Sequence, residues 1–131
     1  VYKRQPLLVP SLAPSTFEEL VDWKVAMSHV RGDRELLREL AGIFLAEWPQ
    51  WIVSLRLELA RGNLEGARTI SHTIKGSLGT FAAKEAHAAA EAIETESRHQ
   101  RIQSAKEALD RLEREMANLL PALAIFARGK P

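Results

Sequence analysis

The chain of 131 residues has the length of one compact domain, long enough to bury a core but too short to add a separate cofactor-binding module. Hydrophobic residues make up 46% and charged residues 27%, which is ordinary for a folded globular protein and excludes wholesale disorder. The formal charge is +1 without a basic block, so nucleic acid is not expected as a partner. Cysteine is absent, which excludes disulfides and sulfur-bound zinc and suits a cytoplasmic location.

The first fifteen residues are expected to form a linker or an extended lead-in. They contain Pro6, Pro10 and Pro14 and show neither a helical nor an alternating period. Val1 in place of methionine suggests either a segment of a longer protein or a deliberately shortened chain. No apolar run approaches the roughly 20 residues that cross a bilayer. We therefore expect no membrane contact by this segment, which leaves open whether a parent protein is membrane-anchored.

The helical part of the chain is predicted to begin at a capping box formed by Thr16 and Glu19. A short helix is expected from about Phe17 to His29, where Arg31 and Gly32 interrupt the pattern.

A second, long helix should follow, with Asp33 as its N-cap. Its apolar residues recur at three- and four-residue steps: Leu36, Leu40, Ile43, Phe44, Trp51, Leu55 and Leu59. Pro49 removes one backbone donor within this pattern, so the sequence predicts a kink near Leu45 to Trp48 or, alternatively, a broken helix.

Three further helices complete the predicted domain. Gly62 and Asn63 end one helix and cap the next, which should run from Leu64 to about Phe81. The next is expected over Lys84–His99, and the last begins at Ile102 and bends at Pro121. No strand pattern is present. The sequence therefore predicts an all-α fold, an antiparallel four-helix bundle over residues 16–127 with a short N-terminal capping helix.

The helix that begins at Leu64 carries a histidine on its exposed face. At roughly 100° per residue, its apolar side chains fall within about 80° of one another and predict a buried stripe. These side chains are Ile70, Ile74, Leu78 and Phe81. His72 lies roughly 160° from the centre of this stripe and should face solvent.

The neighbours of His72 indicate phosphoryl chemistry. Gly76 and Gly79 flank it on the helix surface, where each glycine costs roughly 1 kcal/mol relative to alanine. Bare backbone at this place lets another macromolecule approach the ring. A neutral imidazole is a competent nucleophile, and the ammonium of Lys75 one turn away can neutralise an incoming phosphoryl group.

The segment Ser71-His72-Thr73-Ile74-Lys75-Gly76-Ser77-Leu78-Gly79-Thr80-Phe81 resembles the signature of histidine-containing phosphotransfer (HPt) domains, found in hybrid sensor histidine kinases and chemotaxis-type kinases. The resemblance extends over roughly Phe17 to Leu123. It implies that His72 is the phosphoacceptor, that Lys75 stabilises the phosphate and that Gly76 admits the partner's active site. We add Gly79, Thr69 and Ser71 as candidate docking residues.

The resemblance also implies the partner, a response-regulator receiver domain whose aspartate exchanges a phosphoryl group with His72 in a two-component phosphorelay. The kinase or receiver modules of a parent chain are further possible partners. No cofactor or metal is expected on the chain itself, and Mg²⁺ is expected on the receiver. The chain has no Gly-rich nucleotide loop, so no autonomous kinase activity is expected. The alternative is a non-catalytic helical adaptor that docks receivers without phosphotransfer.

Other candidate residues receive no function. His29, His87 and His99 are interpreted as ordinary histidines. The step from Glu96 to His99 matches only a fragment of a di-iron site, in a stretch from Glu94 to Arg98 that looks solvated. Two tryptophans, Trp48 and Trp51, are expected in the core or at its edge, and the charged run over Glu107–Glu115 is expected to be a solvated helix face.

Overall fold

The computed structural model describes residues 16–129, and the predicted lead-in over residues 1–15 lies outside them. Within the described residues the chain forms six helices and no strand. The helices are α1 (Phe17–Leu20), α2 (Trp23–His29), α3 (Arg34–Ala60), α4 (Leu64–Thr80), α5 (Lys84–Arg98) and α6 (Ile102–Arg128).

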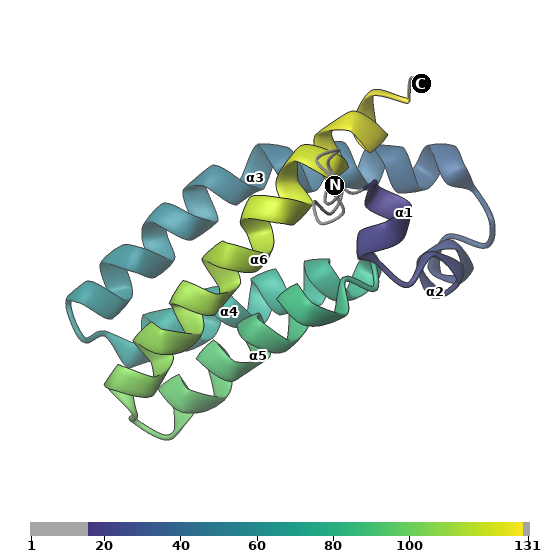
Figure 1. The fold of residues 1–131 in the computed structure, drawn as a ribbon. Coiled ribbons are helices and arrows are strands. Elements are labelled where there is room, and N and C mark those ends of the chain that lie inside the picture. The colour runs from purple at the N-terminus through teal and green to yellow at the C-terminus, as the bar shows by residue number, and fades with distance from the viewer. Residues whose placement is uncertain (1–15, 130–131) are drawn as a thin grey trace, which may run out of the picture.

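The four longer helices form a closed bundle, shown in Figure 1. Helix α3 packs against α4 and α6, and α5 packs against the same two neighbours. Helix α1 lies against α6, and α2 contacts α3. The predicted all-α bundle with a short helical segment at its N-terminal side is confirmed.

The expected single helix from Phe17 to His29 is two helices, and that prediction was wrong in this respect. The capping box is present, since the Thr16 side chain accepts from the Glu19 amide and the Glu19 side chain accepts from the Thr16 amide. The helix nevertheless ends at Leu20. Asp22 begins the next one: its carboxylate accepts from the Val25 amide at 3.3 Å, and its own amide donates to the Ala82 carbonyl at 3.0 Å. This bond ties the break to the turn between α4 and α5.

Helix α3 begins at the predicted cap, where the Asp33 side chain accepts from the Leu36 amide at 3.0 Å. It runs unbroken through Pro49, so the alternative of a broken helix is wrong. Figure 1 shows that α3 bends part-way along its length.

The buried face of α3 differs from the predicted stripe. Leu36 is 39% exposed and Ile43 is 58% exposed. The residues that do face the core are Leu37, Ala41, Phe44, Trp48, Ile52, Leu55 and Leu59. This series follows the 3.6-residue period more closely than the predicted one, because it admits the small Ala41 and leaves two large side chains outside.

The turns that join the bundle helices share one geometry, in which a residue with left-handed backbone follows the helix. These residues are Gly62 (φ 74°), Ala82 (φ 55°) and Gln100 (φ 63°). The next amide then bonds back into the preceding helix, as from Ala83 to the Leu78 carbonyl at 3.2 Å. The turn at Ala82 fixes how α5 lies along α4, which decides what can reach His72.

A core substitution on α6 provides a test of the packing. Leu123 is fully buried, whereas Ile125 on the same helix is 48% exposed. We expect Leu123→Ala to lower the free energy of unfolding by about 2 to 5 kcal/mol, because it removes buried methyl groups and leaves a cavity. Ile125→Ala is the matched control and should change it by less than about 1 kcal/mol. Urea denaturation measures both, and equal losses would contradict this packing.

Candidate functional site

Helix α4 presents His72 to solvent, as predicted. Asn63 caps the helix by accepting from the Gly66 amide at 3.1 Å. Ile74 and Leu78 are completely buried and turn one side of the helix into the bundle. The opposite side therefore faces outwards, and the His72 side chain is 65% exposed. The ring is accessible to a partner.

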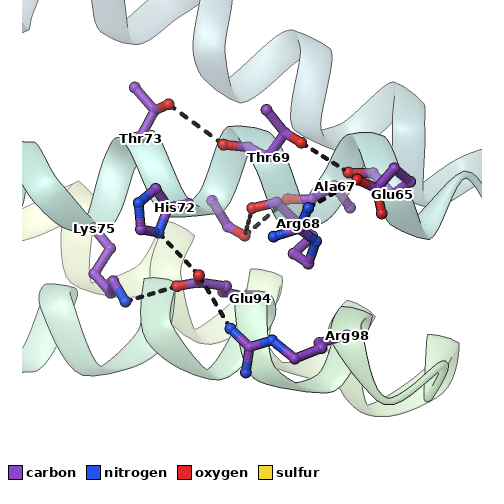
Figure 2. A network of polar contacts seen from close by, with 10 residues as sticks. Glu65, Ala67, Arg68, Thr69, His72, Thr73, Lys75, Glu94 and Arg98 are labelled. Carbon is purple, nitrogen blue, oxygen red and sulfur yellow. Dashed lines mark hydrogen bonds and ion pairs between the residues drawn. The ribbon is translucent and has the colours of Figure 1, made fainter.

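A carboxylate from α5 holds the His72 ring, as Figure 2 shows. Nδ1 of His72 lies 2.9 Å from Oε2 of Glu94. Nζ of Lys75 lies 2.7 Å from the other oxygen, Oε1. Arg98, one turn further along α5, places Nη2 3.2 Å from Oε2. The single carboxylate of Glu94 thus contacts two cations and the candidate nucleophile, His72.

The environment of Glu94 keeps its carboxylate ionised. The side chain is only 5% exposed, and this burial acts to raise its pKa. The hydrogen bonds from Lys75 and His72 act in the opposite direction and outweigh burial, so the pKa of Glu94 is lowered from its ordinary value. The charge is stable in the interior because its partners surround it.

The ionised carboxylate determines the tautomer of a neutral His72. A carboxylate can only accept hydrogen bonds, so Nδ1 must carry the proton that it donates to Glu94. The lone pair of the neutral ring is then on Nε2. The ring is therefore held through one nitrogen while the other stays available for chemistry.

Sequence reasoning missed Glu94, because it took the stretch from Glu94 to Arg98 as solvated, and for Glu94 that was wrong. Ser97 in the same stretch is also buried. The spacing of residues along the helix could have shown that Glu94 is buried. Glu94 follows the buried Ala90 by four residues and Ala86 by eight, which places it on the inner face of α5.

The predicted docking residues do not all lie on the surface. Apart from its own stretch of helix backbone, a Cβ atom at Gly76 would meet no atom within 4 Å, whereas one at Gly79 would lie 3.5 Å from the His87 ring. Thr69 is exposed, with its hydroxyl donating to the Glu65 carbonyl at 3.1 Å.

Ser71 is fully buried, and the docking role assigned to it was wrong. Its hydroxyl donates to the Ala67 carbonyl at 2.8 Å, inside the bundle. The residue falls on the inner side of α4 next to Ile74, so the helical period turns it away from a partner.

Other residues to which the sequence analysis gave no function make contacts within the fold. Nδ1 of His29 lies 3.0 Å from the Thr80 carbonyl at the end of α4. Trp48 is buried and Trp51 is partly buried against the core, as expected.

Among residues 16–129 there is no group of three or more His, Cys, Asp or Glu side chains that could hold a metal ion. In that same range, no helix is long and apolar enough to cross a membrane.

Comparison with known proteins gives one match. The family model described as "Hpt domain" matches residues 39–122, which is more than half of the chain. The chain belongs to the Hpt domain family. Hpt domains act in histidine phosphotransfer in two-component signalling and interact with receiver domains in phosphorelays. The search of curated proteins and the search of solved structures each gave no match. The matched range contains the His72 face of α4 and all of α5.

The lowered pKa of Glu94 predicts how acid affects this Hpt domain. Because the folded pKa lies below the ordinary value of 4.5, the ionised carboxylate stabilises the fold above that value, and this stability is lost as pH falls through the folded pKa. The free energy of unfolding of the wild type relative to that of Glu94→Gln should therefore fall as pH drops below about 4.5. Urea denaturation across this range measures it, and a difference independent of pH would contradict the ion-pair geometry.

Proposed function

We propose that Nε2 of His72 is the phosphoacceptor of this Hpt domain and exchanges a phosphoryl group with the aspartate of a receiver domain. In the forward direction Nε2 attacks the phosphorus of the aspartyl phosphate. The N–P bond forms as the P–O bond to the aspartate breaks, and the carboxylate leaves. The divalent ion that this step requires is proposed to be bound by the receiver.

The observation that carries this proposal is the 2.9 Å contact between Nδ1 of His72 and the buried Glu94. This contact holds the ring in one orientation and leaves the lone pair of the neutral ring on Nε2. The same contact stabilises the positive charge that develops on the ring when Nε2 bonds to phosphorus.

Lys75 is proposed to supply the electrostatic field for the incoming group. Its side chain is only 23% exposed, and its ammonium is fixed 2.7 Å from Glu94 Oε1. The charge is therefore preorganised one turn from His72, where a phosphoryl group brings negative charge.

We propose a cytoplasmic location for the relay, supported by the absence of cysteine.

Phosphoryl transfer from receivers tests the proposal directly. The chain is incubated with a small panel of phosphorylated receiver domains, and the label it takes up is treated with acid and with base. We expect label that is lost in acid and survives base on the wild type, and none on His72→Gln, because only the ring nitrogen can form the N–P bond.

The matched control is His99→Gln, which changes another exposed histidine and should be labelled like the wild type. Label that persists on His72→Gln would refute His72 as the acceptor. A folded wild type that binds receivers but is never labelled, with binding unchanged in His72→Gln, would favour the adaptor alternative.

Gly76 is proposed to give the receiver close access to the ring, and Gly42 on α3 offers a matched control. Both glycines lie within exposed helix surface, and a Cβ atom at either would meet no atom within 4 Å apart from its own stretch of helix backbone. Replacement by leucine should therefore preserve or slightly increase stability at both sites, by about 0.5 to 1 kcal/mol. We expect Gly76→Leu alone to slow transfer at least about tenfold through lost close approach. Equal rates for Gly76→Leu and Gly42→Leu would show that Gly76 is not at the interface.

A further inference from the structure

The two carboxylate oxygens of Glu94 differ in the contacts that would remain if Lys75 or Arg98 moved away. Oε1 is completely buried and has the ion pair with Lys75 as its contact, without a further hydrogen bond. Oε2 has two donors, Nδ1 of His72 at 2.9 Å and Nη2 of Arg98 at 3.2 Å. Departure of Lys75 would leave a buried oxygen without a partner, which is strongly unfavourable. Departure of Arg98 would leave Oε2 bonded to His72.

The exposure of the two cations agrees with this difference. The Lys75 side chain is 23% exposed, whereas that of Arg98 is 51% exposed. The contact of Arg98 with Glu94 uses one of its five N–H donors, and the planar guanidinium matches the oxygens of a phosphoryl group. Arg68, the other arginine near the site, pairs with Glu65 at 2.8 Å. Arg98 is thus the cation on Glu94 that can change partner at the smallest cost.

We propose that Arg98 is a second phosphoryl-binding residue, which releases Oε2 of Glu94 and binds the phosphoryl oxygens once His72 is phosphorylated. Lys75 stays on Oε1 and keeps the buried carboxylate neutralised. The inference rests on the proposed function of His72 and extends it, because the role expected for Lys75 is divided between two cations. The reason for the exchange is charge: the phosphoryl group carries nearly two negative charges near neutral pH and is a stronger attractor than a carboxylate already paired twice.

A cation bound to the phosphoryl group changes the pH midpoint of that group's second ionisation, and this midpoint can be measured. The full chain is phosphorylated with phosphoramidate, a small donor that needs no receiver. Nε2 attacks its phosphorus, the N–P bond to His72 forms as the donor's own P–N bond breaks, and the donor nitrogen leaves as ammonia. The ³¹P signal of the phosphohistidine is then followed against pH, and the midpoint of its second ionisation is recorded.

A guanidinium on the phosphoryl oxygens favours the dianion, so its removal should raise the midpoint. We expect Arg98→Gln to raise it by about 0.5 pH units, roughly threefold in the ionisation constant. Arg101→Gln is the matched control, because Arg101 pairs with Glu96 at 3.1 Å instead. It should leave the midpoint unchanged, and an equal shift in both variants would overturn the proposal.

A double-variant comparison separates direct binding from an effect passed through Glu94. Arg98→Gln is measured again in the presence of Glu94→Gln. If Arg98 binds the phosphoryl group directly, its removal raises the midpoint in both backgrounds. If Arg98 only positions Glu94, the shift disappears in the Glu94→Gln background, and the proposal is wrong.

The experiment also distinguishes this inference from the function on which it rests. Absence of a phosphohistidine signal on the folded wild type would overturn His72 as the acceptor and the role of Arg98 with it. A clear signal with the same midpoint in wild type and Arg98→Gln would overturn the role of Arg98 alone.

Discussion

The site depends on one buried carboxylate. Glu94 lies inside the bundle, where an unpaired charge would be costly, and it is stable there because His72, Lys75 and Arg98 surround it. The same contacts orient the His72 ring. The arrangement that makes Glu94 tolerable in the core is therefore the arrangement that exposes Nε2 to a partner.

The rest of the fold can be understood as the means of placing α5 against α4 in one register. The inner face of α5 is rich in small residues, including Ala86, Ala89 and Ala90, and small side chains let the two helices approach closely. The turn at Ala82 sets the direction in which α5 returns, and the Asp22 amide bonds to the carbonyl of that same residue. The segment that joins the short N-terminal helices thus contributes to the site by fixing the turn between α4 and α5.

Much of this architecture follows from local sequence signals. Caps at Asp33 and Asn63 marked helix starts because their side chains satisfy free amides whatever the tertiary context. The orientation of His72 followed from Ile74 and Leu78 because a helical period fixes which side of a helix is buried.

The errors arose where tertiary contacts decide. Nothing local shows that the Asp22 amide finds the Ala82 carbonyl and divides one helix into two. Glu94 was missed for a different reason: a glutamate is assigned to solvent by default, and its burial becomes favourable through Arg98 on its own helix together with His72 and Lys75 on α4. A polar residue that falls on the inner face of a predicted helix is therefore a candidate for a site, as is a residue on an outer face such as His72.

The burial of Glu94 would link the proposed phosphotransfer on His72 to folding thermodynamics. The carboxylate belongs both to the packing between α4 and α5 and to the contacts of the His72 ring, so a change in one affects the other. Adding a group to His72 alters the partners of Glu94 and hence the free energy of the α4–α5 pair. Phosphorylation of the proposed acceptor would therefore change the local stability of the α4–α5 hairpin, and the opening equilibrium of the hairpin would depend on whether His72 carries the phosphoryl group.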